Sequence, residues 1–150
     1  MAVARAEGAD LRDLARLLWL HAGPEEQARQ SVVSFAEDLA SWWTDHRESH
    51  LAFFARQAES GVVGMTWLAL VPRVPRPGTA TRLSADVQSV YVVPEQRGSG
   101  LGSSLIRAAT DFAIHRGAAR VTVHSGRRAV PVYERLGFVS SRELLQKSAG

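Results

Sequence analysis

The clearest hydrophobic pattern lies in the second half of the chain, where alternation gives way to a continuous apolar run. Residues 86–93 alternate apolar and polar side chains and then read Val-Tyr-Val-Val, which is typical of a strand entering a core. The strand is expected to end at Pro94, because proline cannot donate to a ladder hydrogen bond. Glycines then occupy every second position over 98–102, before a helix-like run over 103–116. The pattern predicts a strand, a glycine-rich turn and a helix in direct succession.

The first fifty residues are predicted to form a short strand and two helices. Residues 2–6 are a strand candidate, and Asp10 fits the N-cap of a helix whose apolar stripe continues to about His21. Pro24 restarts a helix, because proline is favoured in a first helical turn. This second helix is expected to continue through the adjacent tryptophans at 42–43, of which only one can face the core fully.

The remaining segments add strands on both sides of the central unit. The expected elements are strands over 50–57 and 62–71, a Pro-rich connection over 72–83, a strand over 119–125, a helix over 128–136 that ends at Gly137, and one or two short strands over 138–146. The order is therefore β-αα-βββ-α-β-α-β. It predicts an α/β fold with a mixed sheet, in which an antiparallel hairpin precedes a parallel β-α-β unit.

Composition narrows the class of protein without naming a function. The chain has 150 residues with 45% hydrophobic side chains, which predicts one globular domain over 1–150. The net charge is +3, and no basic run with interleaved aromatic residues suggests a nucleic-acid surface. There is no cysteine, so no disulfide framework, zinc–thiolate site or thiol nucleophile is predicted, and no metal site is expected. No signal peptide or membrane-length apolar run is evident, so we expect a cytoplasmic protein with no membrane partner.

The glycine-rich turn has three features that favour binding of an anion. The first N–H groups of a helix lack partners within the helix and carry partial positive charge. Glycines let a ligand approach the backbone, and Arg97 adds a fixed charge. A P-loop is excluded because Lys147 is the only lysine, and a dinucleotide fingerprint fails at Ser103. The turn predicts a phosphate or diphosphate site, with a plain structural turn as the alternative.

Two motifs in the right order resemble the GNAT N-acetyltransferase family. Arg97-x-x-Gly100-x-Gly102, preceded by Val-Tyr-Val-Val-Pro-Glu, is similar to the acetyl-CoA-binding signature of that family. About thirty residues later, Ala129, Tyr133, Gly137 and Phe138 fall at the spacing of the family's second motif. The resemblance covers the whole chain in element order, and it is close in residues over 61–71 and 86–138.

The resemblance implies a GNAT fold and acetyl-CoA as the cofactor. The fold would have six to seven strands flanked by about four helices. The pantetheine arm would pair with the backbone of Tyr91 and Val93, and an N–H near Tyr91 or Val92 would face the developing oxyanion. The diphosphate and the rest of the arm would contact the turn and the second motif; these implied cofactor-binding residues are Gln96, Arg97, Gly98, Ser99, Gly100, Leu101, Gly102, Ser103, Ser125 and Ala129.

Direct transfer in this family needs an acid and a base, but no covalent enzyme intermediate. Tyr133 matches the family's usual general acid, which protonates the departing thiolate. Asp86 on the central strand is the nearest carboxylate for the base, and a solvated strand-end carboxylate is the alternative reading. Glu95 and His124 are weaker candidates, read as a turn residue and a structural histidine.

The acceptor is expected to lie beside the first two helices, as in the family. One of the tryptophans at 42–43 could line its pocket, whereas Trp67 is interpreted as core. The Arg-Pro loop over 73–82 either favours an acidic acceptor or is a solvated surface loop. Two departures from the family matter: Gly126 replaces the usual Asn, and only twelve residues follow Phe138 where a sixth and seventh strand normally fit.

The sequence therefore predicts an N-acetyltransferase that moves an acetyl group from acetyl-CoA to a primary amine. A small-molecule amine is the leading acceptor. A protein or peptide acceptor and a non-catalytic acyl-CoA-binding regulatory module are the alternatives. A homodimer is consistent with a short C-terminal strand, because an incomplete sheet leaves an edge to cover.

Overall fold

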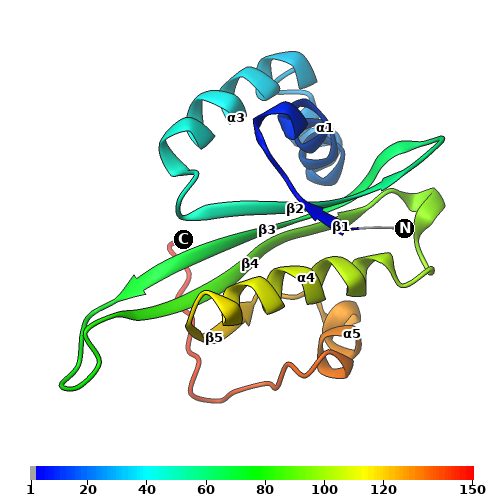
Figure 1. The fold of residues 1–150 in the computed structure, drawn as a ribbon. Coiled ribbons are helices and arrows are strands. Elements are labelled where there is room, and N and C mark those ends of the chain that lie inside the picture. The colour runs from blue at the N-terminus through cyan, green and yellow to red at the C-terminus, as the bar shows by residue number, and fades with distance from the viewer. Residues whose placement is uncertain (1–2) are drawn as a thin grey trace.

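A computed structural model describes residues 3–150, which form one five-stranded mixed sheet with helices on both faces (Figure 1). The strands lie in chain order: β1 (Val3–Arg5), β2 (His50–Gln57), β3 (Gly61–Arg73), β4 (Arg82–Val92) and β5 (Ala118–Val123). Neighbours are antiparallel except β4 and β5, which are parallel. The α/β prediction is confirmed, but the described residues have five strands and not the expected six to seven.

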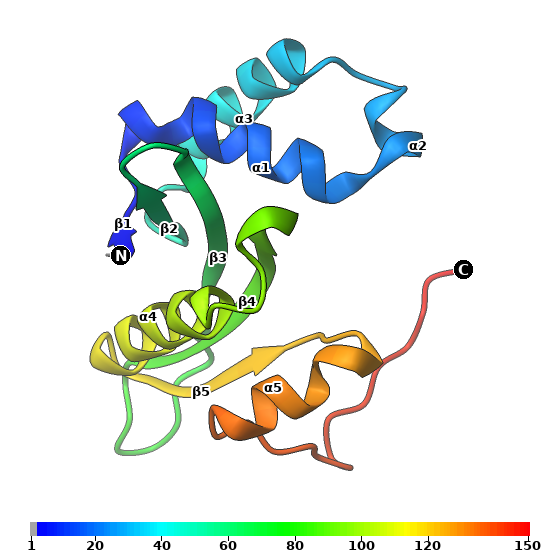
Figure 2. The same ribbon diagram turned by 90° about the vertical axis from the view of Figure 1, so that its right-hand side faces the viewer.

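The helices divide the core into two layers. They are α1 (Leu11–Ala22), α2 (Pro24–Gln27), α3 (Val32–His46), α4 (Leu101–His115) and α5 (Val130–Arg135). Helices α1 and α3 cover one face of the sheet and α4 covers the other, as Figure 2 shows edge-on. Leu14 and Leu17 are fully buried on the first face, and Leu105 is fully buried on the second.

The second predicted helix is broken between residues 28 and 31, where the expectation of a continuous helix from Pro24 was wrong. The backbone turns there because the side chain of Trp19 on α1 donates to the carbonyl of Gln30 at 2.9 Å. Ser31 then starts α3, and its hydroxyl accepts from the N–H of Ser34 at 3.1 Å. Contacts with α1 therefore decide where the helix restarts.

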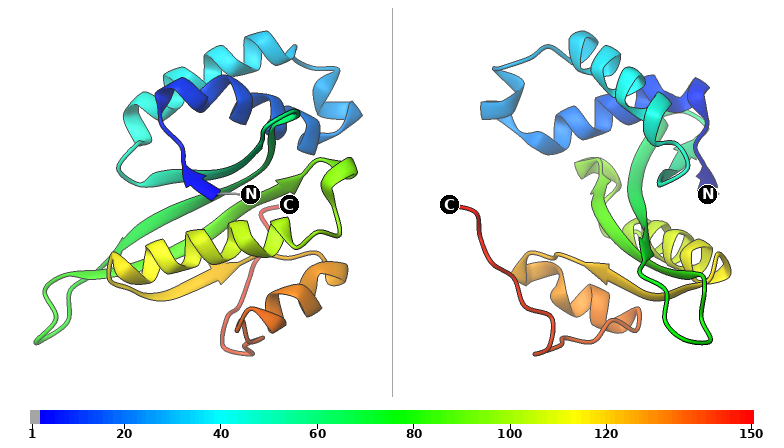
Figure 3. Two further views of the ribbon diagram at one scale, coloured as in Figure 1. Left: turned by 45° about the vertical axis from the view of Figure 1, so that its right-hand side comes forward. Right: turned by 90° about the vertical axis from the view of Figure 1, so that its left-hand side faces the viewer.

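The Pro-rich connection is shorter than predicted, because β3 and β4 continue into it. Pro72 pairs with Leu83 in the ladder, and only residues 74–81 form the tip of a hairpin that projects from the body (Figure 3). Strand β2 begins opposite Ala69, so beyond that point the outer edge of β3 has no strand neighbour within the described residues. Proline is tolerated there because no ladder partner needs its missing N–H.

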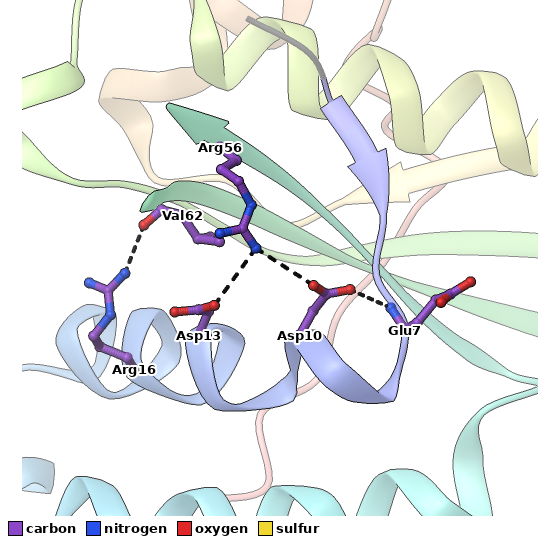
Figure 4. A network of polar contacts seen from close by, with 6 residues as sticks. All are labelled: Glu7, Asp10, Asp13, Arg16, Arg56 and Val62. Atoms are coloured by element: carbon purple, nitrogen blue, oxygen red, sulfur yellow. Dashed lines mark hydrogen bonds and ion pairs between the residues drawn. The ribbon is translucent and has the colours of Figure 1, made fainter. Parts of the chain in front are cut away.

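Ion pairs and a hydrogen bond connect α1 to the β2–β3 hairpin (Figure 4). Arg56 on β2 lies 3.8 Å from Asp10 and 3.9 Å from Asp13, and Arg16 donates to the carbonyl of Val62 at 2.7 Å. Asp10 occupies the N-cap position of α1 as predicted, but its carboxylate makes no capping bond to that helix and accepts from the N–H of Glu7 at 2.8 Å. It therefore caps the preceding short 3₁₀ turn, while its second oxygen faces Arg56.

The chain after α5 contains no helix or strand within the described residues, so the predicted strands over 138–146 were wrong. Gly137 ends the helix as predicted, with φ of 97°, and the N–H of Phe138 donates to the carbonyl of Tyr133 at 3.0 Å. The outer edge of β5 consequently has no strand neighbour among residues 3–150. Across those same residues, the structure has no helix that is both long and apolar enough to cross a membrane.

Candidate active site

Strand β5 pairs with β4 only along the first half of β4. The parallel ladder joins Leu83 to Ala118 and ends at the pair Val87–Val123. Strand β4 continues to Val92 while β5 stops, and on its other side β4 stays paired with β3 as far as Gly64. The second half of β4 therefore offers an unpaired edge where a ligand can add as a strand.

The open edge consists of the backbone groups of Val90 and the N–H of Val92, because the carbonyl of Val92 accepts from Nε of Arg97. The N–H of Val93 donates to the carbonyl of Val63 on β3 at 2.9 Å, so it points away from the gap. Tyr91 lies two residues earlier, pairs with Met65 and points the same way. The expected pairing of the pantetheine arm with Tyr91 and Val93 therefore needs a correction by one residue. The sequence predicts the strand, but it does not predict which backbone groups of β4 form hydrogen bonds with β3.

A bulge lies just below this edge. Trp67 pairs with Ser89 and Leu68 pairs with Val87, so Gln88 is an extra residue in β4. Residues an odd number of positions apart normally point to opposite faces of a strand. Because of the bulge, the side chains of Asp86 and Ser89 point to the same face, which α1 and α3 cover. Tyr91 lies on the same face, where its ring packs with the second core layer and stands 5.3 Å from the ring of His21.

The glycine-rich turn has the geometry of an anion site. Gly98 and Gly100 have φ of 85° and 82°, a left-handed conformation that favours glycine. Gly100 is the N-cap of α4, a fifteen-residue helix, and its carbonyl accepts from the N–H of Ser104 at 3.1 Å. The N–H groups of the first helical residues, 101–103, point out of the helix end. These groups fit the diphosphate of a CoA-type molecule.

The polar side chains of the turn hold it against β4. Arg97 donates through Nε to the carbonyl of Val92 at 2.8 Å, and its guanidinium lies 5.5 Å from the centre of the Tyr91 ring. Ser99 donates to the carbonyl of Gln96 at 2.8 Å. The Gln96 side chain accepts from Gln57 on β2. Because Nε of Arg97 bonds to the carbonyl of Val92 on the strand, the two terminal guanidinium nitrogens remain to bind an anion.

Asp86 lies next to the point where β4 and β5 separate, in the second-last pair of their ladder. The hydroxyl of Thr122 on β5 donates to its carboxylate at 3.0 Å, where the paired part of the two strands nears its end. The carboxylate is half-buried, and it faces the side of the sheet that carries α1 and α3. This contact argues against a freely solvated strand-end carboxylate, since its position is fixed by the neighbouring strand.

Tyr133 lies on the other side of β5 from Asp86. It borders a groove of about 800 Å³ between β5, α4 and α5, together with Thr122 and Ser125. Its ring meets Phe138 edge-on, with centroids 5.4 Å apart. Burial raises the pKa of the Tyr133 phenol above its ordinary value, so the group carries its proton at neutral pH. Thr122 is the residue that contacts Asp86 and also borders the groove of Tyr133.

The other candidates of the second motif and the turn lie apart from Asp86. Ala129 ends a short 3₁₀ turn before α5, and the hydroxyl of Ser125 donates to the carbonyl of Gly126 at 2.8 Å. His124 is exposed just beyond the end of β5, and Glu95 is exposed in the turn after β4. Arg82 precedes Ser89 by seven residues, so the length of strand between them is roughly 23 Å at ~3.3 Å per residue. This separation from the site favours the interpretation of the Arg-Pro loop as a solvated surface loop.

Sequence reasoning missed a cluster of two histidines beside the site. Trp42 stacks on His46 with centroids 4.4 Å apart, and His50 stands edge-on to Trp42 at 4.9 Å. The four-residue spacing of Trp42 and His46 on a helix was visible in the sequence. The link to His50 was not, because it depends on how α3 lies over the start of β2.

Comparisons with known proteins agree with this geometry. Residues 9–138 match the acetyltransferase (GNAT) family, and the chain therefore belongs to that family. Among solved structures it is similar to an acetyltransferase from Trypanosoma brucei, with a TM-score of 0.75, 26% identity and 98% of each chain covered. It also shares its fold with a predicted acetyltransferase from Clostridium acetobutylicum solved with acetyl-CoA, with a TM-score of 0.75, 15% identity and coverage of 98% and 95%.

Two curated relatives match parts of the chain. A glucosamine 6-phosphate N-acetyltransferase from Trypanosoma brucei brucei is 33% identical over 85 residues, which cover 57% of this chain and 56% of that protein. A mycothiol acetyltransferase from Kocuria rhizophila is 31% identical over 129 residues, which cover 80% of this chain and 41% of that protein. The chain thus spans about half the length of these relatives.

Proposed function

We propose that the protein is an N-acetyltransferase that moves the acetyl group of acetyl-CoA directly to a primary amine of a small molecule. The observation that carries the proposal is the unpaired edge of β4 at Val90 and Val92, which leads into the left-handed glycine turn at the start of α4. A donor amide can pair with this edge while the diphosphate meets the helix N-terminus. Acetyl-CoA supplies an activated acetyl thioester when it is bound.

The chain's own residues have distinct roles in this proposal. The N–H of Val90 or Val92 faces the gap and is positioned to donate to a developing oxyanion. Tyr133 carries its proton at neutral pH and protonates the departing thiolate. Asp86, fixed by Thr122, meets the positively charged amine on the acceptor side. The terminal nitrogens of Arg97 and the N–H groups over 101–103 bind the diphosphate.

The choice of a small-molecule acceptor is supported by the relatives, one of which is named a glucosamine 6-phosphate N-acetyltransferase and the other a mycothiol acetyltransferase. A peptide acceptor is the alternative. A panel of glucosamine 6-phosphate, lysine and an alanine-terminated tripeptide distinguishes the two when release of the CoA thiol is followed with each amine. Turnover of the tripeptide alone would replace the small-molecule assignment with the peptide assignment.

Thermal melting with acetyl-CoA tests the donor site first. Acetyl-CoA at 100 times its Kd should add ~2.7 kcal/mol of stability, a rise in Tm of roughly 5–10 °C for a chain of this size. Arg97→Ala should lose most of that shift, and Arg73→Ala on the projecting hairpin should keep it, since both arginines are exposed. No shift in the wild type at millimolar acetyl-CoA would refute the proposed function.

Tyr133→Phe then tests the chemistry. Removing a general acid lowers kcat by ~10²–10⁴-fold, while the melting shift with acetyl-CoA should stay at the wild-type value. An unchanged kcat would show that another group protonates the thiolate. A wild type that binds acetyl-CoA but releases no CoA with any amine would favour the non-catalytic acyl-CoA-binding module.

A further inference from the structure

Four residues form a row across the sheet on the face that carries α1 and α3. His50 on β2 pairs with Ala69 on β3, Ala69 pairs with Asp86 on β4, and Asp86 pairs with Thr122 on β5. Paired residues project to the same face, and two strand spacings separate His50 from Asp86, about 10 Å between backbones. Ala69 contributes only a methyl group, so the side chains on either side of it can approach one another.

Hydrogen bonds fix which nitrogen of each histidine is free. Nδ1 of His50 lies 2.8 Å from the hydroxyl of Ser49, which also lies 3.3 Å from the carbonyl of His46, so Nδ1 is engaged in a hydrogen bond with Ser49. Nδ1 of His46 lies 2.7 Å from the carbonyl of Trp42, which can only accept. In both imidazoles Nδ1 is therefore the nitrogen engaged in a hydrogen bond, and Nε2 is the nitrogen left to meet a ligand.

His50 is partly exposed, and its free nitrogen is not one of the buried atoms that lack a partner. In the described part of the chain, the buried side-chain atoms without a hydrogen-bond partner are Thr66 Oγ1 and Trp67 Nε1, and neither histidine contributes one. Burial, and then the nearby His46, lower the pKa of His50 below its ordinary value. The groups next to His50 are His46 from α3, Ser49 beside it and uncharged Ala69 from β3; Asp86 lies one strand farther on, with its carboxylate bonded to Thr122. His50 is thus a neutral, anchored imidazole at physiological pH.

We propose that Nε2 of His50 accepts the proton of the incoming ammonium group, while Asp86 holds that group by charge. The inference rests on the proposed acetyl transfer and assigns its base. Asp86 attracts the cation, and the imidazole is the side chain whose proton affinity best suits removal of a proton near neutral pH. His124 is exposed beyond the end of β5, and His21 lies beside Tyr91, so both are outside the row.

The proton balance of the step is complete. The ammonium gives one proton to His50, and the neutral amine uses its lone pair to form the N–C bond as the C–S bond of the thioester breaks. Tyr133 gives its proton to the thiolate, and the new amide nitrogen returns one proton to the phenolate through solvent. His50 then releases its proton to solvent, so the sum is one amide, one thiol and one proton from an ammonium and a thioester.

The walls of this site also indicate the class of amine. Trp42 is 39% exposed beside the two histidines, and Trp67 contributes a second indole with centroids 6.4 Å apart. An anionic group held against these rings without a partner would be costly. The site therefore fits a primary amine whose neighbouring carbon atoms are uncharged, with any anionic group of the acceptor farther away.

The test is the pH dependence of kcat/KM for His50→Gln, measured with the amine of the panel (amino sugar, lysine or alanyl tripeptide) that releases CoA fastest. The wild type should lose activity only as the pH falls below about 6.5, where His50 becomes protonated. His50→Gln should lower kcat/KM by ~10²–10⁴-fold at pH 7 and abolish that acidic limb. His46→Gln should keep the limb and move it to higher pH, because it removes the neighbouring charge that lowers the pKa of His50.

Two controls separate a lost base from lost structure. His115→Gln makes the same change at an exposed position in the last turn of α4, and it should retain wild-type kcat/KM. His50→Ala should regain activity when free imidazole is added to the assay, whereas a merely structural defect would not respond. The melting shift with acetyl-CoA should be the same in wild type and both His50 variants.

The outcomes distinguish the base from the reaction. Wild-type turnover with an unchanged pH profile in His50→Gln would overturn the assignment of the base and leave the acetyltransferase standing. A wild type that shows no melting shift with acetyl-CoA and no turnover would overturn the proposed function, and this inference with it. A large loss in His50→Gln, rescue of His50→Ala by imidazole and an unchanged acetyl-CoA shift would support the proposal.

Discussion

Replacing Gly100 with alanine isolates the backbone conformation on which the anion turn depends. Gly100 has φ of 82° and ψ of 7°, and a Cβ built there meets no other atom within 4 Å. Any loss of stability therefore comes from the left-handed backbone and not from crowding. The cost of that conformation for a residue with a Cβ is about 1–2 kcal/mol, which lowers Tm by about 2–8 °C for a chain of this length.

Gly126→Ala is the matched control, because Gly126 also meets no atom within 4 Å but has an ordinary φ of −68°. We expect that variant to melt at or slightly above the wild-type temperature, since alanine restricts the unfolded chain. The assay is thermal unfolding with and without acetyl-CoA, and the acetyl-CoA shift should shrink in Gly100→Ala. Equal melting temperatures for Gly100→Ala and Gly126→Ala would refute the claim that the turn requires a left-handed residue.

Three further predictions concern the core, a helix cap and two titrating groups. Leu105→Ala, at a fully buried position, should lower the free energy of unfolding by about 2–5 kcal/mol, measured in urea, whereas exposed Leu145→Ala should change it little. Ser31→Ala removes the cap of α3 and should cost about 1 kcal/mol in the same assay. Because the pKa of His50 is lowered in the folded protein, the stability should fall as the pH drops below about 6.5. Because the pKa of Tyr133 is raised, the stability should also fall as the pH rises above about 10. Both effects are measured as Tm against pH.

Local patterns were sufficient where one element carries its own signals. The end of the strand before Pro94, the glycine turn and the helix after it were predicted closely, because alternation, proline and spaced glycines act over a few positions, whereas the strand begins at Arg82 and not at the predicted residue 86. The stop of α5 at Gly137 was predicted for the same reason. Arg97 and the N–H groups over 101–103 could be proposed as an anion site because a helix N-terminus follows directly from the sequence.

Features that depend on contacts between elements were not predicted. The interruption before Ser31 depends on a hydrogen bond from Trp19 of α1. The strands expected after Phe138 fail because nothing in that segment alternates, and Val139 and Leu145 stay exposed. The open edge at Val90 and the row from His50 to Asp86 both depend on strand register, which the hydrophobic pattern does not specify at the level of single hydrogen bonds.

The extra residue Gln88 divides β4 into two segments that are out of phase with each other. The earlier segment presents Asp86 to the acceptor side, and the later one presents Tyr91 to the same side only because one position has been skipped. A deletion of Gln88 would leave every functional side chain in the chain and yet turn half of them to the wrong face. Insertions and deletions in this short segment should therefore be far more harmful than replacements, and the length of the strand is itself a functional character that natural variation must preserve.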